Sequence, residues 1–232
     1  MNATTGTTAG TSRPILLLVL AKAPHPGRVK TRLCPPADPV QAADIAAAAL
    51  LDTLDAVRAV PGLPVLALAG NLAGCRRHAE ITAALDGVPV LAQRGTSLGE
   101  RIAAAHADAA ALAPGSPVLQ IGMDTPQIDP DLLSGCAATL RTAGTDAVLG
   151  PAADGGWWAL GLRDPYTAAR IADVPASRAD TGNRTASVLR GHGLHLHPLP
   201  ELRDVDTVHD AAAVASAAPA SRFARAVREL VP

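Results

Sequence analysis

Residues 15–33 read ILLLVLAKAPHPGRVKTRL, an apolar run followed at once by a basic loop that contains glycine and proline. The run 15–20 has the length and the continuous apolar character of a strand buried on both faces of a sheet. In open α/β sheets, ligands bind beyond the carboxyl ends of the strands. Because the basic loop follows that end of the first predicted strand, the stretch predicts an α/β fold with an anion site at this loop.

The loop also contains both lysines of the chain, Lys22 and Lys30, whereas every other basic residue is arginine. An ammonium is a compact point charge and a guanidinium a wide planar fork, so the two do not substitute freely at a phosphate. Neither the phosphate-binding pattern GxxxxGK[ST] nor the dinucleotide pattern GxGxxG is present. A solvated basic loop without function is the alternative, but the confinement of both lysines to it favours phosphate chemistry.

Beyond this stretch, short apolar runs alternate with alanine-rich helical stretches, which predicts a largely parallel sheet covered on both faces. Asp38-Pro39 and Asp129-Pro130 each place a capping carboxylate before a first-turn proline. The predicted strands are 15–21, 64–69, 88–93, 117–122, 147–150, 157–162 and 194–199. The predicted helices are 40–60, 72–85, 98–112, 130–142, 182–190, 208–217 and 221–230.

Composition narrows the classes of protein. Residues 1–13 are polar and small, which predicts a disordered tail, and residues 14–232 show no linker, which predicts a single domain. The formal net charge is −1 without a basic block, so nucleic acid is not expected as a partner. The three cysteines form no CxxC pair, and no apolar run reaches the roughly 20 residues that span a bilayer. We expect a cytoplasmic protein that does not bind membranes.

Two acidic motifs follow predicted strands. Asp124, in the segment GMDTP, lies at the carboxyl edge of the sheet, where a carboxylate suits Mg²⁺ bridging protein and phosphate oxygens. A helix cap is the alternative, but Asp129 already supplies that cap. Asp206, in the segment DVDT, follows the last strand. It is either an N-cap or, together with Asp124, a second metal ligand.

Two further segments are candidates for contacts with substrate. In the segment GPAADGGWWALGL, Gly155 and Gly156 permit close backbone approach, and strand alternation sends Trp157 and Trp158 to opposite faces. The segment is either a simple turn or an acceptor-binding wall that includes Asp154. The polar loop 93–101 reads QRGTSLGER and either contacts a base or ribose or is only a capped loop.

Taken together, AKAPHPGRVKTRL, GMDTP, GPAADGGWWALGL and DVDT resemble the GT-A-like transferases known as glycosyltransferase-like or selenodomain-associated transferases. At a greater distance they are similar to the molybdenum cofactor and 2-phospholactate guanylyltransferases. The resemblance implies a three-layer α/β/α sandwich with a mostly parallel mixed sheet. It also implies that Mg²⁺ (or Mn²⁺) is held by Asp124 and Asp206.

The resemblance assigns further residues by position. Lys30, Arg32 and Asp124 are the candidate catalytic residues, with Lys30 and Arg32 on the nucleotide phosphates. The remaining expected nucleotide contacts are Ala21, Lys22, Gly27, Gly95, Leu98 and Gly99. The expected acceptor contacts are Asp154, Gly155, Gly156 and Trp157.

The activity expected is transfer of a nucleoside monophosphate from a nucleoside triphosphate to a small phosphate- or carboxylate-bearing acceptor. One alternative is a glycosyltransferase that uses a nucleotide-diphosphate sugar, because Asp129-Pro130-Asp131 and Asp204-Val205-Asp206 both fit a DxD metal motif. A second alternative is a non-catalytic nucleotide-binding protein. Base preference, acceptor and oligomeric state do not follow from the sequence.

Overall fold

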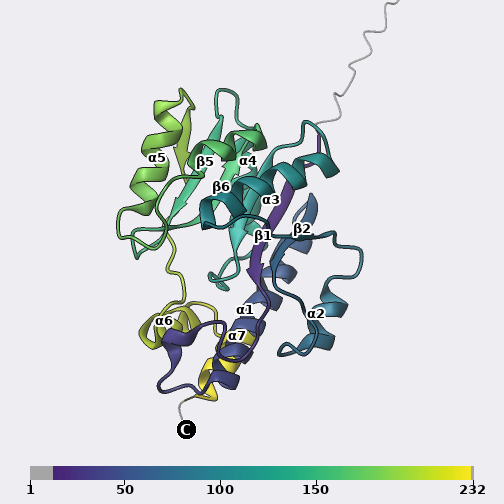
Figure 1. The fold of residues 1–232 in the computed structure, drawn as a ribbon, viewed down its shortest axis with the longest axis vertical. Coiled ribbons are helices and arrows are strands. Elements are labelled where there is room, and N and C mark those ends of the chain that lie inside the picture. Colours follow the sequence, from purple (N-terminus) through teal and green to yellow (C-terminus); the bar gives the residue numbers. More distant parts are fainter. Residues whose placement is uncertain (1–12, 231–232) are drawn as a thin grey trace, which may run out of the picture.

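The computed structural model describes residues 13–230, so the tail expected at residues 1–13 lies almost wholly outside the described residues. Within them, seven strands form one sheet in the order β3-β2-β1-β4-β6-β5-β7 (Figure 1). The strands are β1 (Leu16–Lys22), β2 (Leu63–Ala69), β3 (Val90–Ala92), β4 (Val118–Gly122), β5 (Ala147–Pro151), β6 (Trp157–Leu162) and β7 (Leu196–Pro198).

The sheet is mixed, because β6 runs antiparallel to both of its neighbours, β4 and β5, while the remaining pairs are parallel. After β1 the chain continues outward through β2 and β3, and it then returns to place β4 on the other side of β1. Strand order therefore reverses between β1 and β4. A crevice at the carboxyl ends of two such strands is the usual ligand site of an open α/β sheet.

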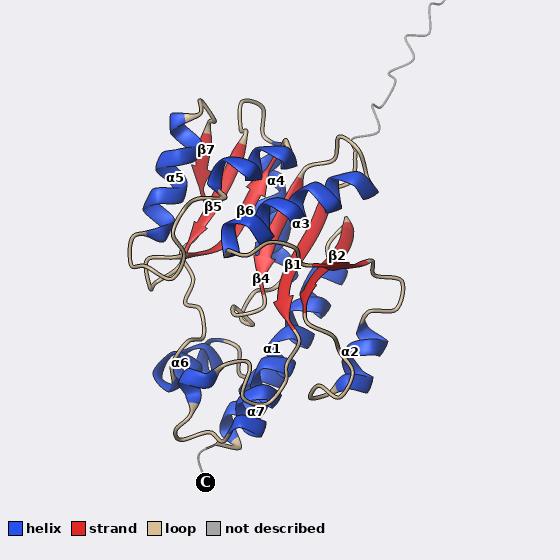
Figure 2. Cartoon of the chain, viewed as in Figure 1, coloured by secondary structure: helices blue, strands red, loops and turns tan. Residues whose placement is uncertain are grey.

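Helices cover both faces of the sheet. Alternate residues of β1 separate the two sides: Ile15, Leu17 and Val19 belong to the core shared with α1 and α4, whereas Leu16 and Leu18 pack with α3. Figure 2 shows α3 crossing in front of the strands. The helices are α1 (Pro39–Arg58), α2 (His78–Ala84), α3 (Leu98–Leu112), α4 (Pro130–Arg141), α5 (Thr181–Gly191), α6 (Val208–Ala217) and α7 (Arg222–Arg228). The predicted three-layer α/β/α sandwich is thus confirmed.

Each predicted strand and helix is present, and the two predicted aspartate caps are formed. Asp38 accepts hydrogen bonds from the backbone of Val40 and Gln41, and Asp129 accepts one from Leu132. The largest boundary error is at α2, which was expected from residue 72 and begins at His78. Gly74 and Arg77 both have positive φ, which interrupts the helical backbone before that point. Two 3-10 helices, η1 (Thr31–Leu33) and η2 (Pro165–Ile171), were not predicted.

A second apolar cluster joins the end of the chain to α1. Phe223 on α7 is fully buried there with Ile45 of α1 and Val205. The backbone N–H of Phe223 donates to Asp52 Oδ2 at 2.8 Å, so α7 is docked by both packing and a hydrogen bond. None of the described helices has the length and apolar character needed to cross a membrane.

Replacing Phe223 with alanine is expected to lower the free energy of unfolding by about 3–5 kcal/mol, because it leaves a cavity in this cluster. Tyr166 is 61% exposed and offers a matched control. Its replacement with alanine should change stability by no more than about 0.5 kcal/mol. Urea unfolding of the two variants checks the expectation, and equal effects would contradict it.

Candidate active site

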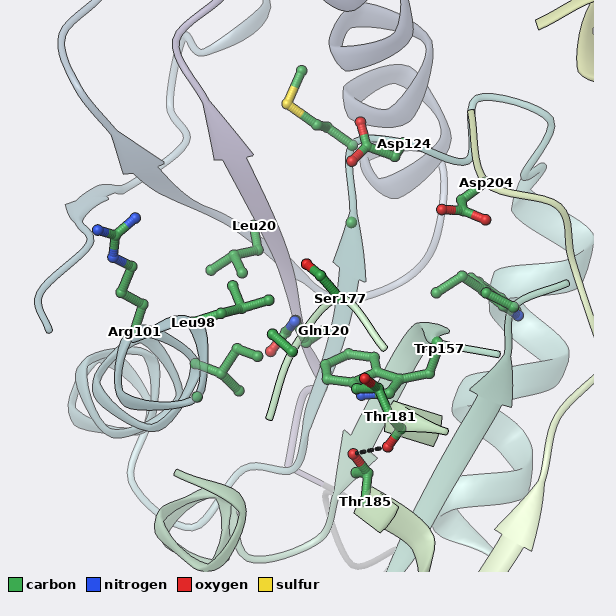
Figure 3. A pocket seen from close by; sticks show the side chains of 18 of the residues that line it. Leu20, Leu98, Arg101, Gln120, Asp124, Trp157, Ser177, Thr181, Thr185 and Asp204 are labelled. Atoms are coloured by element: carbon green, nitrogen blue, oxygen red, sulfur yellow. Dashed lines mark hydrogen bonds between the residues drawn. The ribbon is translucent and has the colours of Figure 1, made fainter. Parts of the chain in front are cut away.

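A cavity of about 410 Å³ opens at the carboxyl ends of β1 and β4, on the α3 side of the sheet. A smaller cavity of about 260 Å³ adjoins it and shares Lys22, Met123, Asp124 and Asp206 with it. We refer to the two together as the cleft. Figure 3 shows Asp124 and Asp204 at one end of the larger cavity, Thr181 and Thr185 at the other, and Gln120 between them.

Lys30 holds the basic loop against the rest of the cleft. It has a left-handed backbone (φ 48°) at the start of η1, and its side chain is only 8% exposed. Its Nζ lies 2.6 Å from Asp124 Oδ1 and also donates to the carbonyl oxygen of Val205. A lysine that is nearly buried and paired with a carboxylate is not the solvated basic residue of the alternative interpretation.

Asp124 lies in the turn after β4 and is not a helix cap, since Asp129 caps α4. Its backbone oxygen accepts a hydrogen bond of 2.8 Å from the N–H of Val205, which joins this turn to the segment before α6. Its side chain is 47% exposed and faces the cleft. The Lys30 ammonium and this carboxylate therefore neutralise each other at the mouth of the cleft.

Three further carboxylates gather beside them. Asp154, Asp204 and Asp206 offer oxygen atoms that all lie within 4.8 Å of one another, and we call them the acidic cluster. Thr207, not Asp206, caps α6, which leaves Asp206 free to pair with Arg32 at 2.7 Å. Burial, together with the negative charges of Asp154 and Asp206, raises the pKa of Asp204 to about 6. The cluster thus carries more negative charge than its surroundings neutralise.

This donor set fits a hard divalent cation, which takes oxygen ligands, including carboxylates and water. Asp124 and Asp206, the expected metal ligands, both line the cleft; Asp206 groups with Asp154 and Asp204, and Asp124 contacts Lys30. Their role as metal ligands stays a prediction. Asp154, an expected acceptor contact, lines the larger cavity and also belongs to the acidic cluster. From the sequence, Asp204 was considered only as part of the DxD pattern Asp204-Val205-Asp206, and not as an individual metal ligand.

The glycine pair before β6 is required for packing. Gly155 has φ +87°, and a Cβ atom there would lie 2.0 Å from the backbone oxygen of Ala179. The N–H of Gly182 donates to the oxygen of Gly155 at 2.8 Å, so the start of α5 rests on this turn. Gly156 lines the larger cavity, whereas Gly155 faces a neighbouring one.

The tryptophans pack on opposite faces of the sheet, as predicted, although both line the larger cavity. Trp158 is 2% exposed, and its indole N–H donates to the oxygen of Pro200 at 2.9 Å. Trp157 is only partly buried and lines the larger cavity (Figure 3).

Of the residues expected to contact the nucleotide, Ala21, Lys22, Leu98 and Gly99 line the larger cavity, and Lys30 and Arg32 line the smaller one. Gly27 and Gly95 line neither. Both have positive φ, so they are explained by the geometry of their loops. Gly99 is also required for packing, because a Cβ there would lie 2.3 Å from the backbone oxygen of Ala172.

Two glutamines line the larger cavity: Gln93 belongs to the loop 93–101 considered for contact with a base or ribose, whereas Gln120 was not selected from the sequence. Gln93 donates its amide N–H groups to the backbone oxygens of Ala21 and Ala67, at 2.8 and 2.9 Å, and so ties the end of β3 to β1 and β2. Gln120 on β4 is 2% exposed, and its Oε1 lies 3.0 Å from Nε2 of His106 on α3. The signal that could have identified Gln120 is a polar residue inside an apolar strand.

His106 makes stability depend on pH. Complete burial lowers its pKa to about 4, so the folded protein keeps it neutral while the unfolded chain takes up a proton below about pH 6.5. Its contribution to stability is therefore intact above pH 6.5 and is lost as the pH falls toward 4. We expect this loss to be on the order of 3 kcal/mol.

The His106→Gln variant isolates this effect, because it lacks the titrating group and keeps every carboxylate. Urea unfolding from pH 7 to pH 4 should give a steeper fall for the wild type than for the variant. Parallel curves would contradict the assignment.

The fold is that of nucleotide-diphospho-sugar transferase-like and cytidylyltransferase-like α/β proteins. The chain belongs to the DUF2064 family, described as an uncharacterized protein conserved in bacteria, whose model matches residues 53–178. No curated protein matches the chain.

Solved structures give the same fold. A Desulfovibrio desulfuricans G20 protein with the provisional name nucleotide-diphospho-sugar transferase is 27% identical (TM-score 0.79, covering 93% of this chain and 94% of that one). A CMP:2-keto-3-deoxy-manno-octonic acid synthetase complexed with CTP is 12% identical (TM-score 0.55, 89% and 98%). A cytidylyltransferase from Leptospira borgpetersenii is 13% identical (TM-score 0.56, 94% of each chain). The resemblance to GT-A-like transferases is confirmed at this level, and the two guanylyltransferase similarities stay predictions.

Proposed function

We propose that the protein is a Mg²⁺-dependent nucleotidyltransferase that moves a nucleoside monophosphate from a nucleoside triphosphate to a small phosphate- or carboxylate-bearing acceptor. The proposal depends on one observation: basic side chains and carboxylates lie together in one cleft. Lys22, Lys30 and Arg32 supply positive charge, and Asp124 and the acidic cluster supply the carboxylates. A metal–triphosphate complex presents the complementary charges of both signs.

The chain's own residues have separable roles in this reaction. Lys30 and Arg32 hold the triphosphate and stabilise negative charge as it develops on the phosphate oxygens. Asp124, Asp204 and Asp206 would hold the cation, which would supply positive charge to neutralise phosphate oxygens. Lys30 already pairs with Asp124, and Arg32 with Asp206, so both cations would exchange a carboxylate for phosphate oxygens while the carboxylates became free for the cation. No unpaired charge has to be buried.

The acceptor oxygen attacks the α-phosphorus and forms the new P–O bond, while the bond from the α-phosphorus to the bridging oxygen breaks and pyrophosphate leaves. The wall formed by Gly156, Trp157 and Thr181 is the proposed acceptor side of the cavity. An apolar ring beside small polar groups suits a small organic acceptor.

Transfer of a sugar from a nucleotide-diphosphate sugar is the second candidate. It is favoured by the similarity to the Desulfovibrio protein and its provisional name. The same cation and the same basic loop would serve the diphosphate of that donor. The two reactions differ in product, because only nucleotidyl transfer releases pyrophosphate.

The test has two arms. Thermal unfolding is followed with ATP, GTP, CTP, UTP and nucleotide-sugars, each with Mg²⁺ or with EDTA, since a ligand that binds only the native state raises its melting temperature. Pyrophosphate release is then measured with the stabilising triphosphate and a panel of phosphorylated and carboxylated acceptors.

We expect Mg²⁺-dependent stabilisation by one triphosphate, followed by pyrophosphate release. Stabilisation by nucleotide-sugars alone would contradict nucleotidyl transfer and support a glycosyltransferase. Metal-independent binding without turnover on any acceptor would indicate a non-catalytic nucleotide-binding protein.

A further inference from the structure

Gln120 is a polar residue in an apolar row of the sheet. In register across the strands it lies between Leu18 of β1 and Leu160 of β6, and the row continues to Val65 and Leu149. Gln120 is 2% exposed, as buried as its apolar neighbours. A buried amide is costly unless its polar atoms are hydrogen-bonded. The amide therefore needs partners on both its oxygen and its nitrogen.

The oxygen has its partner in His106. This side chain is fully buried on α3, and its Nε2 lies 3.0 Å from Oε1 of Gln120. When the amide oxygen of Gln120 faces His106, Nε2 must carry the proton and donate to it. Nδ1 is then an acceptor, and it has no partner among the described residues. The reversed amide would instead require a buried Nδ1–H without a partner, and orphaned buried N–H groups are the rarer kind.

The amide nitrogen is consequently turned to the cavity. Gln120 is one of the residues that line it, and Figure 3 shows its side chain between Leu20 and Leu98 on one side and Trp157 on the other. The site is thus built from an N–H₂ donor of fixed direction, set among apolar walls. It suits an uncharged ring that carries a hydrogen-bond acceptor.

The position of Gln120 indicates which part of a ligand it meets. It stands four residues before Asp124 on β4 and its turn, and a strand advances roughly 3.3 Å per residue. Gln120 therefore lies roughly 7 Å from the end of β4 at Gly122, and the charged end of the cleft lies beyond it in the turn. This separation suits the base of a nucleotide whose phosphates lie at Lys30 and Asp124.

We propose that Gln120 selects the donor nucleotide by donating a hydrogen bond to an acceptor atom of its base, and that His106 is the positioning residue that fixes the direction of this amide. The inference rests on the proposed function for the identity of the ligand. Apolar walls exclude water from the contact, so a base without a correctly placed acceptor leaves the amide N–H₂ unpaired and binds more weakly.

The experiment measures dissociation constants by calorimetry, with the full chain and Mg²⁺, for ATP, GTP, CTP, UTP and inorganic tripolyphosphate. Tripolyphosphate has no base and reports on the charged end alone. The variants are Gln120→Met, which keeps the shape without a donor, His106→Leu, which removes the positioning group, and His106→Gln, which can still donate to Oε1. Thermal unfolding of each variant without nucleotide records its stability separately.

We expect Gln120→Met to weaken the preferred triphosphate on the order of 10-fold and to leave tripolyphosphate unchanged. His106→Leu should reduce discrimination among the four bases, and His106→Gln should restore it. In the free wild type, nitrogen-15 spectra at pH 7 should show the Nε2–H tautomer of His106.

Four results would overturn the inference. They are unchanged discrimination in Gln120→Met, an equal loss for tripolyphosphate, an Nδ1–H tautomer of His106, and a wild type that binds all four triphosphates and tripolyphosphate alike. The last of these leaves nucleotidyl transfer standing. A wild type that binds neither triphosphates nor tripolyphosphate overturns the proposed function, and the inference with it.

Discussion

Replacing Lys30 with alanine is expected to lower the turnover number by about 10²–10³-fold, the usual cost of removing one preorganised group that stabilises transition-state charge. The side chain is nearly buried and is held by Asp124 and the carbonyl of Val205, so its position is fixed before a ligand binds. Among the described residues Lys30 is the lysine that pairs with Asp124, although Lys22 lines the same cleft, and an arginine at this place would present a wider, planar head. We therefore expect Lys30→Arg to be impaired as well.

Pyrophosphate release at saturating substrate measures this effect, with Arg225→Ala as the control. Arg225 is an exposed cation on α7, outside the cleft, and its loss should leave turnover unchanged. Turnover of Lys30→Ala within a factor of three of the wild type would contradict the role. Because Lys30 contacts Asp124, the double variant with Asp124→Asn should lose less than the product of the two single losses.

The acidic cluster should respond to substitution in two opposite ways. Asp204→Asn removes a carboxylate whose pKa is raised by burial and by its acidic neighbours. Above about pH 6 the ionised group destabilises the folded state, and this cost disappears as the pH falls toward the ordinary value of the group. The variant should therefore be more stable than the wild type at pH 7, on the order of 1 kcal/mol after allowance for partial exposure.

The same substitution should raise the Mg²⁺ concentration needed for half-maximal activity, on the order of 100-fold. Asp210 supplies the control, because it belongs to the α6 cap and not to the cluster, so Asp210→Asn should leave the Mg²⁺ requirement unchanged. Urea unfolding and a Mg²⁺ titration of activity check the two effects. A less stable Asp204→Asn variant with an unchanged Mg²⁺ requirement would contradict the cation site.

The fold could be predicted from local patterns, because strands buried on both faces have continuous apolar sequences. The two Asp-Pro caps also mark where α1 and α4 begin. The start of α2 was wrong because the backbone of Gly74 and Arg77 depends on the local path of the loop and not on apolar periodicity. The short 3-10 helices carry too few residues to show a period.

Site residues could be predicted where a single segment contains the signal, but not where the site is formed by contact between distant segments. The loop with Lys30 and the turn with Asp124 could each be selected alone. The grouping of Asp154 with Asp204 and Asp206 could not, because it depends on the backbone pairing of residues 151–153 with Leu202, two segments far apart in the sequence. His106 and Gln120 were missed for the same reason. His106 lies in an alanine-rich helix and Gln120 in a strand, and their role depends on a contact between these two elements that the sequence does not show.

Val205 joins the lysine loop to the turn that carries Asp124. Its oxygen receives Lys30 from 175 residues earlier in the chain, and its N–H binds the oxygen of Asp124. In extended backbone, side chains alternate, so the burial of Val205 sends Asp204 and Asp206 to the opposite side, toward the cleft. A ribosome that has delivered the sheet as far as β5 has therefore produced a lysine loop with one of its two partners still missing. The charged site is therefore incomplete until the segment around Val205 has been synthesised and has docked on the turn of Asp124.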